Sequence, residues 1–164
     1  FVNEVKDFQV QILDTRKTTP GLRLFEKYAV TCGGGFNHRL DLSSGILIKD
    51  NHINAAGSIT NAVAKSRAAN SGLKIEVEVE NFDQLREAIA SGADGFLLDN
   101  MPVETTIEAV RIVRSAPGGE QLFIESSGGI TLETLSGYVR TGVNAISVGA
   151  LTHSARAANV HLEF

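Results

Sequence analysis

The chain has 164 residues, of which 43% are hydrophobic and 21% are charged, as expected for a globular domain with its own core. Its 15 lysine and arginine residues against 19 aspartate and glutamate residues give a formal net charge of −4, which argues against nucleic acid or an anionic membrane as the main partner. The single cysteine, Cys32, excludes an intrachain disulfide and a cysteine-based zinc site. No apolar run approaches the ~18 residues of a membrane span.

Short apolar segments alternate with segments of helical periodicity along the chain. The six expected strands are Val10–Leu13, Ile46–Ile48, Lys74–Val79, Gly95–Leu98, Leu122–Ile124 and Ala145–Val148. The four expected helices are Ile59–Ser71, Phe82–Ser91, Val103–Arg114 and Leu132–Thr141. Gly72, Gly92 and Gly142 follow three of these helices, at the position where glycine adopts a left-handed conformation without penalty. The alternation predicts parallel strands with helical crossovers.

Two stretches of the chain share one design. Ser91–Asp99 and Thr141–Gly149 each run from a helix stop through a small apolar residue to Asp94 or Asn144, and then into a strand. We interpret them as an internal βα repeat.

No linker or charge run divides the chain, so we expect one domain over residues 1–164. Its opening on Phe1, without an initiator methionine, suggests part of a longer chain. No Gly-x-Gly-x-x-Gly motif follows the first strand, which disfavours a dinucleotide-binding fold.

Charged or glycine-rich residues follow the carboxyl end of every expected strand. These stretches are Asp14–Pro20, Lys49–His52, Glu80, Asp99–Asn100, Glu125–Gly129 and Gly149–Ala150. The residues that precede the strands are helix stops and plain turns. Loops that are merely hydrated would give a weaker form of this asymmetry, whereas a β/α barrel gives it fully, because its active face lies at the carboxyl ends of the strands. We therefore predict the α/β class and an incomplete or open β/α barrel of the TIM type.

The third expected strand alternates Glu76, Glu78 and Glu80 with Val77 and Val79. The glutamates therefore share one face of the strand and the valines share the other. An unpaired buried carboxylate is costly, so the glutamate face has to meet cations, a metal ion or water. An exposed edge strand would also accommodate this alternation.

The strand ends together carry a local surplus of positive charge. Four permanent cations, Arg16, Lys17, Arg39 and Lys49, face mainly Glu78 and Asp99, while Asp14, Asp50 and Glu76 are candidates for structural partners. A cationic surplus inside an acidic protein indicates a polyanionic ligand. The glycine-rich loops Ser127-Gly128-Gly129 and Val148-Gly149-Ala150 follow the last two strands, where barrels often bind phosphate.

The histidines and the cysteine are less informative. His38 follows a triple-glycine turn and is a candidate site residue, while His52 could be structural, ligand-facing or a hydrogen-bond brace. His153 and His161 are expected on the surface. Cys32 has no evident base beside it, so we expect a small packed residue rather than a nucleophile.

Several short motifs together carry a family resemblance. They are Asp14–Arg23, Glu26–Val30, Cys32–Gly35, Asn37–Arg39, Leu47–His52, Glu76–Glu78, Leu98–Asn100, Glu125–Ile130 and Ser147–Ser154. Over nearly the whole chain they resemble quinolinate phosphoribosyltransferases, also called carboxylating nicotinate-nucleotide pyrophosphorylases. The resemblance implies a cytoplasmic, homo-oligomeric pentosyltransferase of NAD biosynthesis. It would convert quinolinate and phosphoribosyl pyrophosphate, with Mg²⁺, into nicotinate mononucleotide, pyrophosphate and CO₂.

The resemblance also implies a role for each motif. Arg16, His38, Arg39 and Lys49 would hold the two carboxylates of quinolinate, and Lys17, with Thr15 beside it, would contact phosphoribosyl pyrophosphate. Glu78 and Asp99 would face the ribose hydroxyls and Mg²⁺, and with Lys49 they are the expected catalytic residues. The 5′-phosphate would be bound by Ser127, Gly128, Gly129, Val148, Gly149 and Ala150.

Two departures from the family pattern qualify the resemblance. Asp41 and Ser44 stand where many members have glycine and aspartate, and we expect this to be harmless loop variation. Members also carry an N-terminal domain and an opening barrel strand ahead of this region, so we expect residues 1–164 to be the catalytic barrel domain without them. Two alternatives stay open: another phosphate-binding barrel, such as a nicotinate phosphoribosyltransferase or a decarboxylating synthase, and a ligand-binding or self-associating barrel fragment without activity.

Overall fold

The computed structural model describes residues 1–69 and 72–164. Its strands are β1 (Gln11–Leu13), β2 (Ile46–Ile48), β3 (Ile75–Val79), β4 (Gly95–Asp99), β5 (Phe123–Ser127) and β6 (Ala145–Ser147). Its α-helices are α1 (Val2–Val5), α2 (Arg23–Cys32), α3 (Asp50–Ala56), α4 (Ile59–Ala68), α5 (Phe82–Ala90), α6 (Val103–Ser115), α7 (Leu132–Tyr138) and α8 (Ala150–His153), and a short 3-10 helix, η1, spans Gly119–Gln121. All six expected strands are present.

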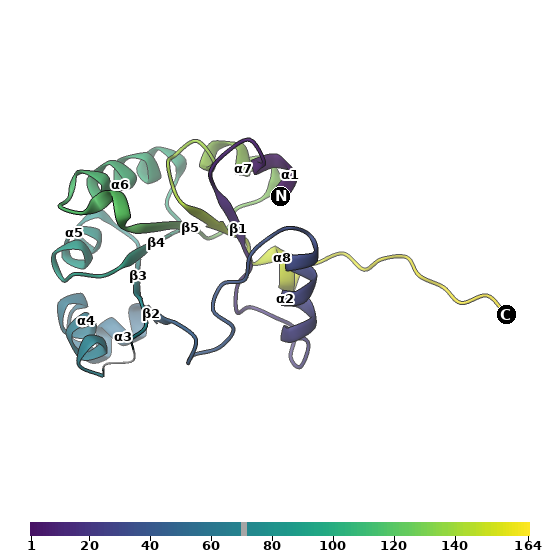
Figure 1. Cartoon of the computed structure of the whole chain (residues 1–164), viewed down its shortest axis with the longest axis horizontal. Helices are drawn as coiled ribbons and strands as arrows, with labels where there is room; N and C mark the ends of the chain where they lie inside the picture. The colour runs from purple at the N-terminus through teal and green to yellow at the C-terminus, as the bar shows by residue number, and fades with distance from the viewer. Residues whose placement is uncertain (70–71) are drawn as a thin grey trace.

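The six strands form one parallel sheet in the order β1-β6-β5-β4-β3-β2. The sheet curves into an arc, with α4, α5, α6 and α7 along its outer side (Figure 1). Phe36 forms a parallel bridge with Leu13, so the segment after α2 runs beside β1. The prediction of an open β/α barrel is confirmed. The edge-strand alternative for the third strand is wrong, because β3 pairs with both β2 and β4.

The outer face of the sheet and the helices form the hydrophobic core. Ile75, Val77 and Val79 of β3 are buried in this core, together with Ile124 of β5 and Ile146 of β6. The glutamates that alternate with the β3 residues therefore point to the concave side. The expected division of β3 into a valine face and a glutamate face is confirmed.

The helix boundaries follow local capping. Ser58 and Asn81 cap α4 and α5 by accepting hydrogen bonds from the backbone N–H groups of Asn61 and Gln84, at 3.0 and 2.9 Å. Gly72, Gly92 and Gly142 have φ angles of 70°, 76° and 89°, as the sequence predicts. The helix predicted over Leu132–Thr141 ends earlier, at Tyr138. The end of the helix predicted over Ile59–Ser71 lies outside the described residues.

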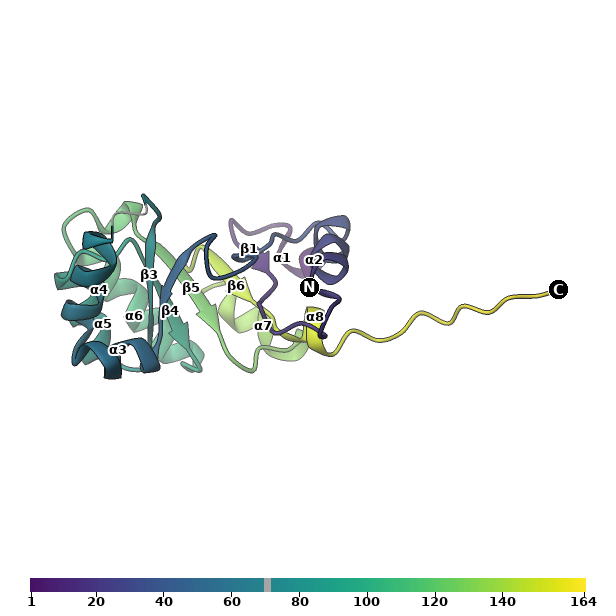
Figure 2. The same cartoon turned by 90° about the horizontal axis from the view of Figure 1, so that it is seen from below.

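Four α-helices, α1, α2, α3 and α8, were not expected from periodicity. In α2, the large apolar side chains of Leu24, Phe25 and Tyr28 are 68%, 72% and 69% exposed, so its apolar residues do not mark its buried face. The helices in residues 1–69 and 72–164 include none with both the length and the apolar character needed to cross a membrane. The chain after α8 extends away from the sheet (Figures 1 and 2).

The predicted internal repeat has a structural role at the amino ends of the strands. Asp94 Oδ2 accepts a hydrogen bond from Ile75 N at 2.8 Å, and Asn144 Oδ1 accepts one from Ile124 N at the same distance. The backbone N–H groups of Asp94 and Asn144 donate to the carbonyl oxygens of the same two residues, Ile75 and Ile124. Each repeat therefore fastens a strand to a neighbouring strand through one polar side chain.

Replacing Asn144 with alanine should destabilise the fold. The change leaves Ile124 N and the Arg114 guanidinium, which donates to Asn144 Oδ1 at 2.9 Å, without this acceptor. We expect a loss of about 1–3 kcal/mol in the free energy of unfolding, measured by urea denaturation. The matched control is Asn159→Ala in the exposed C-terminal segment, and equal stability of the two variants would contradict this role of Asn144.

Candidate functional site

A cavity of about 520 Å³ opens at the carboxyl ends of the strands. Eleven of the predicted site residues line it: Thr15, Arg16, Lys17, His38, Arg39, Lys49, Glu78, Asp99, Ser127, Gly128 and Gly129. They come from the ends of β1, β2, β3, β4 and β5 and from the segment after α2. Residues separated by more than 100 positions thus meet in one cavity, at the face where β/α barrels place their active sites.

Cations form one side of this cavity. Burial lowers the pKa of Arg39, and the positive charge of the nearby Arg16 guanidinium lowers it further. Arg39 donates to the Gly45 carbonyl oxygen at 3.0 Å, while the buried Nε of Arg16 has no hydrogen-bond partner within the described residues. Two neighbouring guanidinium groups, one with an unused donor, make a favourable site for carboxylate or phosphate oxygens.

Carboxylates lie next to these cations. Lys49 Nζ forms an ion pair with Glu78 Oε2, linking the end of β2 to β3. Asp99, at the end of β4, accepts a hydrogen bond from the Asn100 amide at 2.8 Å. Glu78 and Asp99 line the same cavity, and carboxylate oxygens are the ligands that Mg²⁺ prefers. This donor set fits Mg²⁺ bound by one or two carboxylates and completed by substrate phosphate and water.

A glycine loop closes the cavity beyond β5. Gly128 has a φ of 94°, and a Cβ atom built on it would lie 2.3 Å from Asn100 Oδ1 and 2.8 Å from Asn100 N. Gly129 has a φ of 61°, with nothing within 4 Å of its Cβ position. Only glycine suits both positions, because each has a left-handed backbone and Gly128 also packs against Asn100. The loop thus presents bare backbone to the cavity.

Three predicted phosphate-binding residues lie beside the cavity rather than in its lining. The side chain of Val148 is buried in the core outside the sheet. Gly149 precedes α8, with its Cβ position 3.7 Å from Thr15 Oγ1, and Ala150 begins that helix. Any contact of Val148 with a ligand would therefore be through its backbone. Ser147, which sequence reasoning left out, lines the cavity instead.

Sequence reasoning also missed the buried Lys27. It forms an ion pair with Asp14, and both side chains are almost inaccessible to solvent, at 2% and 0% exposure. The interpretation of Asp14 as a structural partner rather than a catalyst agrees with this placement. Arg23, one turn before Lys27 at the start of α2, donates to Thr18 Oγ1 at 3.1 Å and to the Arg16 carbonyl oxygen at 3.3 Å. These bonds brace the loop after β1.

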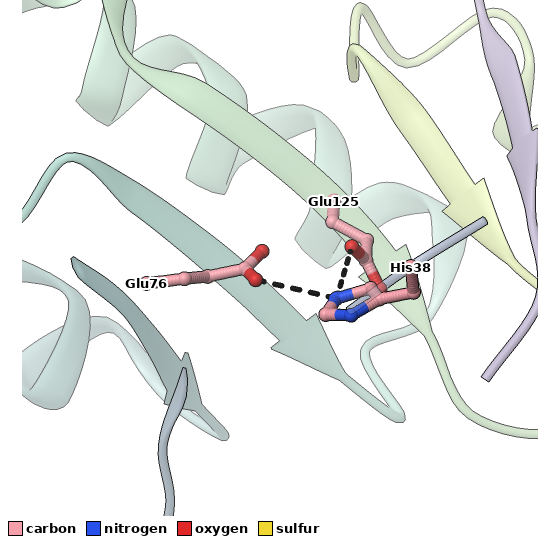
Figure 3. Close-up of side chains that lie close together, drawn as sticks. All are labelled: His38, Glu76 and Glu125. Atoms are coloured by element: carbon pink, nitrogen blue, oxygen red, sulfur yellow. Dashed lines mark ion pairs between the residues drawn. The ribbon is translucent and has the colours of Figure 1, made fainter. Parts of the chain in front are cut away.

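A cluster of His38, Glu76 and Glu125 lies at the floor of the cavity (Figure 3). His38 and Glu125 line this cavity, while Glu76 lines a neighbouring one together with His38. His38 Nε2 lies 3.2 Å from Glu125 Oε2 and 3.4 Å from Glu76 Oε2, and Glu125 is fully buried. The other ring nitrogen, Nδ1, accepts a hydrogen bond from Arg39 N at 2.8 Å. Both ring nitrogens of His38 therefore have protein partners. Direct contact with a substrate carboxylate would require the ring to lose its contact with one of these partners. Glu125 was missed as a partner of His38, since nothing in the sequence pairs it with a residue 87 positions earlier.

The same three side chains have ligand atoms within 4.8 Å of one another, which is compatible with a metal site. The hydrogen bonding of His38 argues against that use. A histidine that binds metal through one nitrogen donates a proton from the other, whereas His38 Nδ1 faces a donor. The cluster is better suited to sharing protons between an imidazole and two carboxylates.

The carboxylates alter the protonation of His38. Burial alone would lower its pKa, but the hydrogen bonds and charges of Glu125 and Glu76 outweigh burial and raise it to about 10. A pKa raised above the unfolded value of about 6.5 contributes stability that is fully present below that pH and is lost as pH rises through about 10. The Arg39 N–H that faces Nδ1 opposes a second proton on the ring, which works against this rise in the pKa of His38.

Glu125→Gln should lower the pKa of His38, as measured by NMR titration of its ring. Below pH ~6.5 the variant should also have a free energy of unfolding that is lower than that of wild type by about 1.4 kcal/mol or more, which corresponds to one pKa unit. This difference from wild type should shrink as the pH rises to about 10. An unchanged His38 titration in this variant would contradict the assignment.

The remaining predicted residues fall outside the cavity. His52 Nδ1 accepts a hydrogen bond from Lys49 N at 2.9 Å, which makes it the hydrogen-bond brace among the three alternatives. His153 and His161 are exposed, as expected. The expectation that Cys32 is packed is wrong: it is exposed at the end of α2, where the following glycines leave little side-chain volume to cover it.

Comparison with known proteins places this geometry in context. The profile of the family described as "Quinolinate phosphoribosyl transferase, C-terminal domain" matches residues 1–163. The probable carboxylating nicotinate-nucleotide pyrophosphorylase of Bacillus subtilis is 51% identical over 96% of this chain and 53% of its own length. The corresponding Mycobacterium leprae protein is 46% identical over 99% of this chain and 57% of its own length. The nicotinate-nucleotide pyrophosphorylase structure from Francisella tularensis superposes with a TM-score of 0.88 at 45% identity, covering 94% of this chain and 54% of that one. The chain thus spans about half the length of these relatives.

Proposed function

Since the chain belongs to the family of quinolinate phosphoribosyl transferase C-terminal domains, we propose that its cavity is the site where quinolinate and phosphoribosyl pyrophosphate react. The products would be nicotinate mononucleotide, pyrophosphate and CO₂, in NAD biosynthesis. The observation that carries the proposal is the meeting of Arg16, Arg39 and Lys49 with Glu78, Asp99 and a glycine loop in one cavity. The cations suit a dicarboxylate, and the carboxylates and the glycine loop suit a phosphorylated sugar, so the two substrates could bind side by side.

The cationic side would bind the dicarboxylate. Arg16 and Arg39 offer planar forks, and Lys49 offers a point charge, so two carboxylates can be held in a fixed orientation. Holding quinolinate there would aim its ring nitrogen at the anomeric carbon of the second substrate. We assign His38 to the same half of the site, where its contacts with Glu125 and Glu76 shape the floor.

The other half would bind phosphoribosyl pyrophosphate. Lys17, with Thr15 beside it, would offset charge on the pyrophosphate, and Ser127, Gly128 and Gly129, with Gly149 and the backbone of Val148 and Ala150 nearby, would hold the 5′-phosphate. Glu78 and Asp99 would face the ribose hydroxyls and Mg²⁺. When bound, Mg²⁺ would supply positive charge to the departing pyrophosphate.

The reaction would form two bonds, from the ring nitrogen to the anomeric carbon and from C2 to a proton taken from solvent, and would break two, from the anomeric carbon to pyrophosphate and from C2 to its carboxyl group. As pyrophosphate leaves the anomeric carbon, positive charge develops there, and Glu78 or Asp99 would stabilise it. The ring nitrogen then bonds to that carbon and becomes quaternary. Loss of CO₂ from C2 leaves an electron pair next to the positive nitrogen, and a proton takes the place of the carboxyl group. Lys49 would hold the carboxylates until the nitrogen is alkylated and CO₂ has left.

A nicotinate phosphoribosyltransferase or a decarboxylating synthase is the competing enzyme. Either would use the glycine loops but would not need Arg16, Arg39 and Lys49 together, because a monocarboxylate engages fewer cations. The non-catalytic alternative is a barrel fragment that binds ligand or associates with itself.

We also propose that the protein is cytoplasmic and forms a dimer or a larger homo-oligomer. The exposed Leu24, Phe25 and Tyr28 on α2 support association, because large apolar side chains clustered on one helix face mark interaction surfaces. The net charge of −4 gives no support to a nucleic-acid partner.

Product formation tests the proposed activity. A full-length protein, meaning this chain joined to the N-terminal domain that the family carries, would be incubated beside the 164-residue chain. Each would receive phosphoribosyl pyrophosphate and Mg²⁺, with quinolinate or nicotinate. We expect nicotinate mononucleotide from quinolinate only, and competition by phthalate, which is also a dicarboxylate. Turnover of nicotinate instead would assign the competing enzyme, and turnover of neither by the full-length protein would leave the non-catalytic alternative.

A further inference from the structure

A buried ion pair lies outside the cavity, between α2 and the end of β1. Lys27 is 2% exposed and Asp14 is fully buried, and neither lines the cavity. Lys27 is among the largest fully buried side chains of the described residues, in a chain whose other lysines reach solvent at least in part. A lysine and an aspartate are rarely buried so deeply unless their contacts serve a purpose.

The contacts of this pair converge on the backbone of His38. Lys27 Nζ donates to the His38 carbonyl oxygen at 3.0 Å, and Asp14 Oδ1 accepts a hydrogen bond from His38 N at 2.9 Å. The side-chain amide of Asn37, oriented to satisfy both neighbours, donates to the Lys27 carbonyl oxygen and to Asp14 Oδ2. The peptide groups on both sides of His38 are therefore held by one ion pair.

The next link runs from His38 to the cavity. Arg39 N donates to His38 Nδ1 at 2.8 Å, and Arg39 reaches across to the Gly45 carbonyl oxygen. The loop that follows this segment, 40–45, has no regular secondary structure, and the hydrogen bonds of Asp41 stay within that loop, to Ser43 and Ser44. A shift of the His38 backbone would thus move both His38 and Arg39 relative to Arg16.

Stability alone does not account for the pair. Burying two charges costs more than their attraction commonly returns, and apolar residues of similar volume are often as stable or more so. Burial raises the pKa of Asp14 despite the opposing hydrogen bond and charge of Lys27, so the pair does not fully offset the burial of the carboxylate. What apolar residues could not replace is the hydrogen bonding to the His38 backbone.

We propose that Asp14 and Lys27 are positioning residues that fix His38 and Arg39 in the dicarboxylate half of the cavity. This inference rests on the proposed function and adds to it two residues that touch no substrate. It assigns α2, a helix on the outer side of the site, a part in recognising the dicarboxylate.

Binding measurements on the full-length protein test this. Isothermal titration calorimetry would compare quinolinate and phosphoribosyl pyrophosphate binding to wild type and to the double variant Asp14→Leu/Lys27→Met. We expect quinolinate affinity to fall about tenfold or more, while phosphoribosyl pyrophosphate affinity stays within about twofold, with a melting temperature close to that of wild type. A purely structural role would instead reduce the active fraction for both ligands equally.

Arg114→Met is the matched control, because it removes a different cation, a part-buried one, that hydrogen-bonds the backbone carbonyl oxygens of Gly119 and Leu122 at the opposite ends of the strands. It should lower stability without changing either affinity. Wild-type quinolinate affinity in a folded double variant would overturn the proposal.

If that double variant does not fold, Asp14→Asn/Lys27→Met decides, since it leaves no unpaired buried charge and keeps an amide oxygen as acceptor for His38 N, but lacks the Lys27 donor to the His38 carbonyl oxygen and should show the same selective loss. Failure of both variants to fold would assign the pair to stability and overturn the proposal. The proposed function fails separately, if wild type binds no quinolinate.

Discussion

Replacing Lys49 with methionine should lower kcat/KM for quinolinate by about 100- to 1,000-fold, the usual cost of removing one preorganised charged partner from an active site. Lys49 ends β2, lines the cavity and pairs with Glu78 from the neighbouring strand. Methionine keeps most of the aliphatic stem but not the charge. The loss should appear in turnover as well as in quinolinate binding, because the same ammonium group would hold the carboxylates through decarboxylation.

Lys74→Met is the control for that experiment. Lys74 is 89% exposed, pairs with Asp94 at the amino ends of the strands, and does not line the cavity. It should keep wild-type kinetics. Near-normal turnover of both Lys49→Met and Glu78→Ala would contradict the assignment of this cavity as the catalytic site.

Replacing Gly128 with alanine should lower kcat/KM for phosphoribosyl pyrophosphate by about 100-fold. The added Cβ would lie 2.3 Å from Asn100 Oδ1, and the φ of 94° is strained for any residue with a side chain. Because the atoms in the way include the Asn100 backbone nitrogen, the loop has to move, and a displacement of about 1 Å can cost that much in rate.

The matched control is Gly118→Ala. Gly118 has a φ of 73° but nothing within 4 Å of its Cβ position, and it lies before η1, away from the cavity. The backbone strain is therefore comparable, while the clash and the loop displacement are absent. We expect modest destabilisation and normal kinetics. Equal kinetics for the two glycine variants would argue against a tightly fitted phosphate loop.

The fold was largely predictable because its strands are fully buried on their outer face. The apolar runs that become β3 and β4 need helices to cover them, and the glycines after the helices mark where each crossover turns back. The limits of this reasoning show in α2, whose exposed Leu24, Phe25 and Tyr28 give no usable buried stripe. Cys32 at its end was wrongly expected to be packed, because the glycines that follow it leave little side-chain volume to cover it.

Placement of the site residues was predictable where position along a strand decides it. Arg16, Lys49, Glu78 and Asp99 follow or end strands, so parallel pairing brings them to one edge. The contacts of His38 were not predictable, because they depend on how the segment after α2 folds over the sheet. The burial of Lys27 and Glu125 shows only in three dimensions, since a lone lysine in a helix and a glutamate in a strand are ordinary surface residues in a sequence.

The most direct test is the fate of the two carboxylates of quinolinate. The full-length protein would be given phosphoribosyl pyrophosphate, Mg²⁺ and quinolinate labelled with ¹⁴C in either the 2-carboxylate or the 3-carboxylate. The proposed function predicts labelled CO₂ from the 2-carboxylate only, strictly dependent on phosphoribosyl pyrophosphate and lost in Lys49→Met. Release without phosphoribosyl pyrophosphate, or no release from either position, would contradict it.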